Sequence, residues 1–309
     1  MAIKTLLTVG RVSNLPTVWT NILAAAVLAQ TSELTPGFVS VFSVEHAAML
    51  WPGTLLALSI MYLGGMFLND AFDADWDRQN NPSRPIAGGE ISEQTVWAIG
   101  GGLILLAVLM IGYLYQQVLL QKLPNETYQQ YYGWLAAALL ASAIIAYNAW
   151  HKQFAHSAFI MGACRFGIYL VGALLLAQLT FKVTLAALSL LLYIAGLTYL
   201  ARQEHRNRIT HLWPLFLLFS PVAVALLSGF DSLYFWFYLA GFIAWVISRL
   251  RFVLGTTEPN VKACIGGLLA AIPLLDGLML ASVDALISSL VCLFVFLIIP
   301  RLHRWVSGT

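Results

Sequence analysis

Long apolar runs separated by short polar gaps repeat along the whole chain. A helix that crosses a membrane needs roughly 20 apolar residues, and many of these runs reach that length. Pro and Gly mark several gaps, as in TPG, NPSRP and TTEPN. The pattern predicts ten membrane-spanning helices, at 12–31, 47–71, 93–116, 131–149, 156–178, 183–203, 211–229, 232–252, 260–281 and 284–303.

The polar gaps FDS and SVD between the last two pairs of segments are very short, so nine spans is an alternative. We therefore predict an all-α fold, a polytopic membrane helix bundle of nine to ten helices, with residues 1–309 forming one domain. The first apolar run, about Val18 to Ala29, has no small-residue cleavage site before polar sequence. We interpret it as a retained first helix.

Composition supports a multi-pass integral membrane protein. The chain is 60% hydrophobic and 10% charged, with a mean hydropathy of +0.80, whereas soluble domains carry about 25% charged residues. The net charge of +2 is too small to suggest a nucleic acid partner, and the six His show no metal-ligand spacing. Cys164, Cys264 and Cys292 sit singly in apolar runs, which predicts small buried hydrophobes.

Lys and Arg concentrate on the cytoplasmic side of membrane proteins. With ten spans, thirteen of the 16 fall on one side, two fall on the other and Arg165 lies within a span. This asymmetry predicts that both termini are cytoplasmic, together with the loops after the second, fourth and sixth helices.

The stretch FLNDAFDADWDRQNNPSRP places four acids at the end of the second apolar segment. Residues three and four apart share a helix face. The spacing predicts that Asp70, Asp73 and Asp77 lie on one side of an extended second helix, in line with Asn69. Asp75 is predicted to point elsewhere, into solvent.

Carboxylates packed together repel one another, and a divalent cation relieves that repulsion. Mg²⁺ prefers oxygen ligands and is often completed by substrate phosphates. Arg84 follows the acids, and Lys152 and Arg202 come from the other two polar loops. Metal-bound acids with converging cations suit a diphosphate. A solvated acidic loop at a helix end is the alternative, and the cytoplasmic excess of cations explains the loop arginines and lysine without a ligand.

Two charges lie within predicted spans. Arg165 stands about nine residues into the fifth helix, and an intramembrane charge should face a cavity or a partner. Two interpretations of Arg165 remain. It binds a ligand, or it forms a salt bridge with an Asp or Glu that faces the inside of the bundle. Asp276, deep in the ninth helix, is either functional or part of a helix-packing hydrogen bond near Pro273 and Gly277.

The motif NDAFDADWD fits the NDxxDxxxD signature of the UbiA-type intramembrane prenyltransferases, and NNPSRPIAGGEIS fits its continuation. RVSNLPTVWTNILA is similar to the family's first helix, and YNAWHK to its element after the fourth helix. The resemblance covers at least residues 11–208. It implies a helix bundle around a central cavity that opens to lipid.

The resemblance also implies roles for single residues. It implies that Asn69, Asp70, Asp73 and Asp77 hold Mg²⁺ and the prenyl diphosphate, that Arg84 and Lys152 bind diphosphate oxygens, and that Tyr147 and Asn148 line the same pocket.

The sixth helix departs from the family pattern, which has a second acidic motif there. The comparable stretch is LTYLARQEHRNR, in which Leu197 stands in the place of the first Asp and Glu204 in the place of the next. The second metal site is therefore reduced to Glu204, with Gln203 beside it. Either Arg202 and its neighbours supply the missing charge at the substrate, or catalysis is altered or lost.

The function expected from these features is Mg²⁺-assisted transfer of an isoprenoid chain from a prenyl diphosphate to a hydrophobic acceptor, aromatic or lipid-like. A membrane phospho-alcohol transferase is a weak alternative, because the stretch lacks the Gly and Ala-Arg of the pattern DxxDGxxAR. The second alternative is a lipid-binding or transport protein on the same scaffold, and the altered sixth helix supports it.

Overall fold

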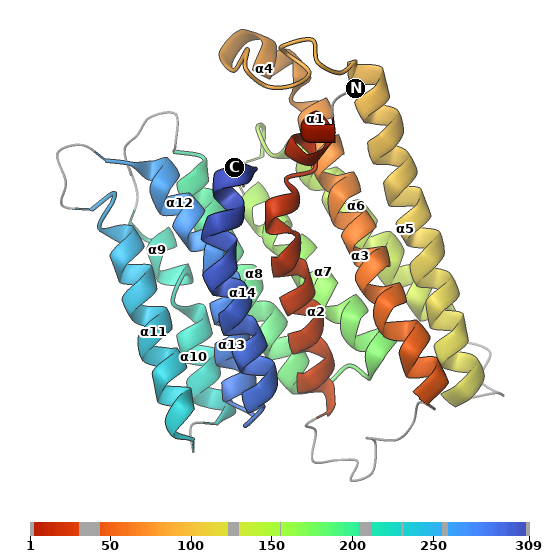
Figure 1. Cartoon of the computed structure of the whole chain (residues 1–309), viewed down its shortest axis with the longest axis vertical. Helices are drawn as coiled ribbons and strands as arrows, with labels where there is room; N and C mark the ends of the chain where they lie inside the picture. Colours follow the sequence, from red (N-terminus) through yellow and green to blue (C-terminus); the bar gives the residue numbers. More distant parts are fainter. Residues whose placement is uncertain are drawn as a thin grey trace.

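The computed structural model of the chain describes residues 3–30, 44–122, 130–154, 156–203, 212–229, 232–254 and 259–306. Within these ranges every regular element is a helix, which confirms the all-α fold (Figure 1). The elements are α1 (Ile3–Val9), η1 (Val12–Asn14), α2 (Leu15–Gln30), α3 (Val44–Phe72), α4 (Ala74–Asn80), α5 (Glu93–Lys122), α6 (Gln130–Trp150), α7 (Ser157–Leu176), α8 (Phe181–Ala201), α9 (Pro214–Leu217), α10 (Ser220–Ser228), α11 (Leu233–Leu250), α12 (Val261–Ala270), α13 (Ile272–Ala281) and α14 (Leu286–Trp305).

Among the described residues, nine helices are long and apolar enough to cross a membrane, counting α12 and α13 as one. The predicted helix at 211–229 is the exception, because two short helices, α9 and α10, replace it. Pro214 and Pro221 stand in the first turns of α9 and α10. Proline lacks the N–H that a helix interior needs, so one continuous helix was the wrong prediction for this segment.

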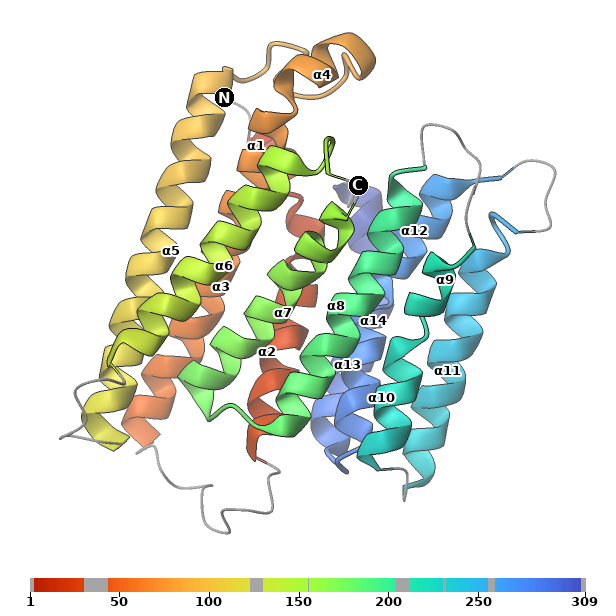
Figure 2. The same cartoon turned by 180° about the vertical axis from the view of Figure 1, so that it is seen from behind.

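The predicted ninth helix is also divided, since α12 ends at Ala270 and α13 begins at Ile272. Pro273 stands in the first turn of α13. Helices α9 and α10 follow one another along α8, and both are in contact with it (Figure 2). Helix α1, helix α4 and the last turn of α14 all lie at the same end of the bundle.

Two large apolar clusters form the core, and α2 and α7 contribute to both. Ala25 of α2 and Tyr169 of α7 belong to the cluster with α8 and α10–α14. Ile22 of α2 and Ile168 of α7 belong to the cluster with α3, α5 and α6. The helices α2 and α7 therefore form a central layer between two packed halves (Figure 2).

The outer surface of the bundle is apolar. Leu227, Leu233 and Ile287 are each at least 80% exposed. Such a surface is stable against lipid rather than water, so the chain is a multi-pass integral membrane protein. The three cysteines are buried, as predicted.

Candidate active site

The acidic motif lies where α3 gives way to α4. Helix α3 ends at Phe72, Asp73 is the N-cap of α4, and α4 lies across the end of the bundle (Figure 1). The prediction of one extended helix is therefore wrong. Carboxylates are favoured near a helix N-terminus and disfavoured near a C-terminus, so acids at the start of α4 favour two helices over one.

Asp70, in the last turn of α3, is buried beside two arginines from other segments. Arg11 Nη2 lies 3.3 Å from Asp70 Oδ1 and also donates to Asn69 Oδ1 at 3.0 Å. Arg84 Nη1 lies 3.8 Å from the same Asp70 oxygen. The predicted residues Asn69, Asp70 and Arg84 therefore do come together, with Arg11 as an added member.

Arg11 was not predicted as a site residue, because the sequence shows it only as one cation among many at a membrane boundary. Its backbone is left-handed, with φ 42° and ψ 47°, a conformation that non-glycine residues adopt at some cost. Tyr62 donates its hydroxyl to the Arg11 carbonyl at 3.3 Å. Burial would lower the pKa of Arg11, but the Asp70 carboxylate together with Tyr62, Tyr147 and Asp73 outweighs burial and raises that pKa.

Asp73 meets the turn after α6. Lys152 Nζ forms an ion pair with Asp73 Oδ1, and His151 Nε2 lies 3.3 Å from the same oxygen. Burial would raise the pKa of Asp73, but the contacts with His151 and Lys152 hold it below its ordinary value. Lys152 Nζ also lies 4.7 Å from the centre of the Trp76 ring. The predicted Lys152 is thus in place, and His151, from the same YNAWHK element, is an addition.

Asn148 links α6 to α3. It accepts a hydrogen bond from Asn69 Nδ2 at 3.0 Å and donates to the Gly65 carbonyl at 3.1 Å. The bond to Asn148 fixes the Asn69 amide so that its oxygen faces Arg11. Tyr147 stacks on His151 with ring centres 5.3 Å apart, and therefore lies beside this group as expected.

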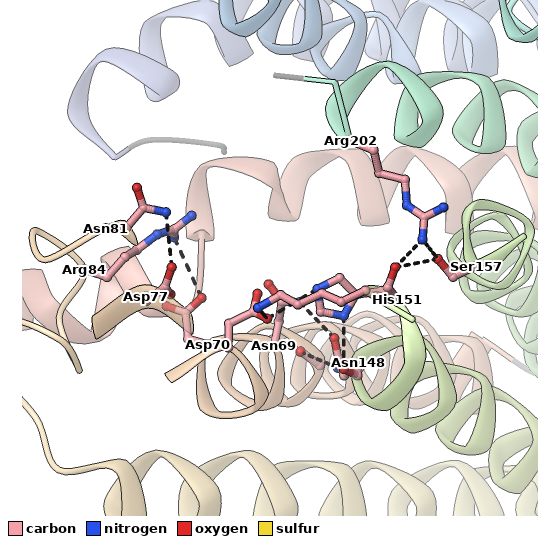
Figure 3. A network of polar contacts seen from close by, with 12 residues as sticks. Asn69, Asp70, Asp77, Asn81, Arg84, Asn148, His151, Ser157 and Arg202 are labelled. Atoms are coloured by element: carbon pink, nitrogen blue, oxygen red, sulfur yellow. Dashed lines mark hydrogen bonds and ion pairs between the residues drawn. The ribbon is translucent and has the colours of Figure 1, made fainter. Parts of the chain in front are cut away.

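Arg84 is positioned by the turn between α4 and α5. Its N–H donates to the Asn81 carbonyl at 3.0 Å, and its own carbonyl accepts from Gly88 N–H at 2.7 Å. Gly89 follows with φ +74°, a conformation that glycine adopts without strain. Asn81 also donates its side-chain amide to Asp77 Oδ1 at 3.2 Å. Figure 3 shows Asp70, Asp77, Asn81 and Arg84 at one end of the polar network.

Asp75 points away from this group, as predicted. Its side chain is 93% exposed, and its Oδ1 lies 2.5 Å from Arg78 Nη1. We call the remaining members the α3–α4 site, defined as Asn69, Asp70, Asp73 and Asp77 with the cations Arg11, Arg84 and Lys152.

Arg202 lies at the other end of the network (Figure 3). It donates to the carbonyls of His151 and Phe154 and to Ser157 Oγ, the last at 2.5 Å. It therefore ties the end of α8 to the turn between α6 and α7. Glu204, the predicted fourth metal ligand, lies outside the described residues.

Arg165 is not part of the α3–α4 site. It is the ninth residue of α7, and its Nη1 donates to Asn21 Oδ1 at 3.0 Å. Asp276 joins the same buried group by accepting from Asn21 Nδ2 at 2.8 Å and from Tyr169 at 2.5 Å. A direct salt bridge was one of the two alternatives for Arg165, and the structure has a contact through Asn21 in its place. Asp276 bonds to other helices rather than to its own neighbours.

Within the part of the chain that the structure describes, no three His, Cys, Asp or Glu side chains are grouped as metal ligands. Each carboxylate of the α3–α4 site has its own partner instead: arginines at Asp70, Lys152 at Asp73 and Asn81 at Asp77. The site is thus a set of buried oxygens balanced by cations from separate segments.

Fold and site together define a multi-pass helical membrane protein with an acid–cation site at one end of its bundle. The profile of the UbiA prenyltransferase family matches residues 17–263, and the chain belongs to that family. It is an intramembrane prenyltransferase.

Two solved structures are similar to this chain. A structure of digeranylgeranylglyceryl phosphate synthase is 19% identical, with a TM-score of 0.59 over 92% of this chain and 98% of that one. The apo structure of a UbiA homolog from Aeropyrum pernix K1 is 18% identical, with a TM-score of 0.47 over 94% of this chain and 97% of that one. No curated protein sequence gives a match.

Proposed function

We propose that the α3–α4 site binds a prenyl diphosphate and stabilises the diphosphate as it leaves the isoprenoid chain. The observation that carries this proposal is the buried Asp70 carboxylate between Arg11 and Arg84, two cations that are far apart in sequence. Asp73 with Lys152 repeats the arrangement on the neighbouring turn. An acidic loop that faces solvent would need neither burial nor cations from three segments.

The donor set suits Mg²⁺. Asn69, Asp70, Asp73 and Asp77 offer only oxygen ligands, which hard cations prefer, and a partial protein shell leaves room for phosphate oxygens. When bound, Mg²⁺ would neutralise the carboxylates and the phosphate charge together. These four residues would hold it. Glu204 remains a proposed further ligand.

The cations act on the leaving group. Arg11, Arg84 and Lys152 are held by carboxylates of the protein, and these contacts fix their positions. Fixed donors stabilise developing negative charge without reorganisation, and this favours ionisation of the allylic C–O bond. Tyr147 and Asn148 support the same pocket through His151 and Asn69.

The hydrophobic acceptor then attacks the carbon that the diphosphate leaves, and the proton that the acceptor loses goes to the released diphosphate. The apolar helices around the site support an acceptor that is itself aromatic or lipid-like, in contact with the bilayer. The excess of Lys and Arg at the end that carries α4 supports a cytoplasmic location for the site and for both termini.

Diphosphate release tests the proposal. Purified protein is given geranylgeranyl diphosphate, Mg²⁺ and an extract of hydrophobic membrane compounds as the acceptor source, and diphosphate release is compared among wild type, Asp73→Ala and Asp75→Asn. Asp75 is the matched control, because it is acidic, two residues away and 93% exposed. We expect release by wild type and Asp75→Asn and a loss on the order of a hundredfold in Asp73→Ala. Equal release by all three proteins would contradict the role of Asp73.

A further inference from the structure

A second buried polar group lies in the central layer of the bundle. Arg165 and Tyr169 of α7, Asn21 of α2 and Asp276 of α13 form it, and we call it the Arg165 network. Asn21, Tyr169 and Asp276 are fully buried, and Arg165 is 8% exposed. Charged groups within membrane spans are costly and mark functional sites.

The hydrogen bonds of the Arg165 network fix its orientation. Asn21 accepts from Arg165 through Oδ1 and donates to Asp276 through Nδ2. A flipped amide would turn its NH₂ toward the guanidinium and its oxygen toward the carboxylate, and both contacts would be repulsive. Tyr169 occupies the other Asp276 oxygen. Asp276 therefore sets the orientation of Asn21, and Asn21 sets the position of Arg165.

The Arg165 guanidinium has more N–H groups than hydrogen bonds to the protein. A guanidinium carries five N–H groups. Among the described residues it makes one hydrogen bond, to Asn21, and its Cζ lies 5.6 Å from the centre of the Tyr62 ring. A side chain this buried needs further oxygen partners, because unpaired charged donors are expensive away from water. We take these donors to be the binding element for a ligand.

The position of Arg165 identifies which substrate supplies the oxygen. Tyr62, over which Arg165 lies, precedes Asn69 by seven residues on α3, about 10 Å along the helix. Asp276 is the carboxylate that acts on Arg165, and none of the α3–α4 site carboxylates does. Arg165 therefore lies apart from the diphosphate in that site, which has its own three cations. A prenyl chain carries no oxygen, so the acceptor is the substrate that can meet Arg165.

The charge of the network indicates the kind of oxygen. Arg165 and Asp276 are its one cation and one acid, and the groups that face Arg165 are otherwise Tyr62 and Cys164. An anionic ligand would add an uncompensated charge to a buried neutral set, which is unfavourable at low dielectric. A hydroxyl or carbonyl oxygen adds none.

We propose that Arg165 donates hydrogen bonds to an uncharged oxygen of the acceptor, and that Asn21, Asp276 and Tyr169 are positioning residues for it. This inference rests on the proposed function, since it assumes a prenyl diphosphate in the α3–α4 site. It assigns the acceptor a class, an apolar molecule with a hydroxyl or carbonyl group that reaches the middle of the bundle.

The test uses two fluorescent probes that differ by one carboxylate, 1-naphthol and 1-hydroxy-2-naphthoate. Binding of each is measured for wild type, Arg165→Met and the double variant Arg165→Met/Asp276→Asn, which restores charge neutrality. Tyr193→Phe is the control, because it removes a buried hydrogen bond to the Leu268 carbonyl outside the network. Geranylgeranyl diphosphate binding with Mg²⁺ is measured in parallel for every protein.

We expect wild type and Tyr193→Phe to bind 1-naphthol more tightly than the naphthoate. Both Arg165 variants should lose at least about tenfold in 1-naphthol affinity, the effect of one hydrogen bond to a charged group, while the double variant regains thermal stability. Diphosphate binding should be unchanged.

Three results would overturn the inference: full 1-naphthol binding by the double variant, tighter binding of the naphthoate by wild type, or binding of neither probe by wild type that binds the diphosphate. If wild type does not bind geranylgeranyl diphosphate with Mg²⁺, that result would instead contradict the proposed function.

Discussion

Lys152, in the turn after α6, forms an ion pair with Asp73, the N-cap of α4. The pair joins two loops at the end of the bundle and places an ammonium group beside the carboxylates of the α3–α4 site. Arg202 supports it from a third segment, because it binds the carbonyls of the same turn. The site is therefore assembled by contacts between loops rather than by one helix face.

Removal of the Lys152 charge should impair turnover more than folding. We expect Lys152→Ala to lower kcat/KM for geranylgeranyl diphosphate on the order of a hundredfold, because a fixed donor to the leaving group is lost. Steady-state diphosphate release measures it. Lys4→Ala, at an exposed cation of α1 at the same end of the bundle, is the control and should retain wild-type rates. A similar loss in both variants would indicate a general charge effect.

Arg11 tests the site at a residue with a left-handed backbone. In Arg11→Asn the buried Asp70 carboxylate loses one of its two arginines, so the unfolding temperature should fall. The variant should still fold, because asparagine tolerates that backbone. It should nevertheless weaken geranylgeranyl diphosphate binding about tenfold, since one charge-assisted hydrogen bond is lost. Titration calorimetry and thermal unfolding on the same preparation check both parts. Undiminished affinity would remove Arg11 from the site.

Asp276 should matter to the stability of the bundle. In Asp276→Ala, Asn21 and Tyr169 lose their acceptor and the buried Arg165 loses its counter-charge. We expect a destabilisation of roughly 3 kcal/mol or more. Tyr169→Phe, which removes one donor only, should cost about 1–2 kcal/mol. Unfolding in detergent with denaturant gives the two values, and an Asp276→Ala protein as stable as wild type would contradict the network.

The close packing of α7 on α8 depends on a small residue. A Cβ at Gly162 would lie 2.4 Å from the Leu191 carbonyl oxygen, whereas a Cβ at Gly101 of α5 meets nothing within 4 Å. Gly162→Ala should therefore destabilise by about 1–3 kcal/mol. Gly101→Ala should be neutral or stabilise by up to about 1 kcal/mol. Thermal unfolding of the pair checks this, and equal effects would contradict the packing.

The sequence predicts the apolar helices of this bundle well, because hydropathy over about 20 residues reports directly on membrane span. It predicts less well where proline interrupts an apolar run, as at Pro214 and Pro221, since composition there still indicates a span. The motif around Asp70 and Lys152 predicts which residues gather, but not the turn at Asp73 that separates the carboxylates.

Contacts between distant segments were beyond prediction. Arg11 reaches Asp70 only through a left-handed backbone that no pattern marks. Asn21 and Asp276, in α2 and α13, are neighbours only because α13 packs on the central layer. The sequence marks Asp276 as costly, and only the fold supplies its partners.

Mass spectrometry of the transfer product shows whether the protein moves an isoprenoid chain to an acceptor. Wild type and Asp70→Asn are incubated with geranylgeranyl diphosphate, Mg²⁺ and an extract of hydrophobic membrane compounds as the acceptor source. We predict a new lipid species that carries one geranylgeranyl group with wild type, and its absence with Asp70→Asn. Retention of bound isoprenoid by wild type without diphosphate release or any geranylgeranylated species would contradict it, and would favour a lipid-binding protein on this scaffold.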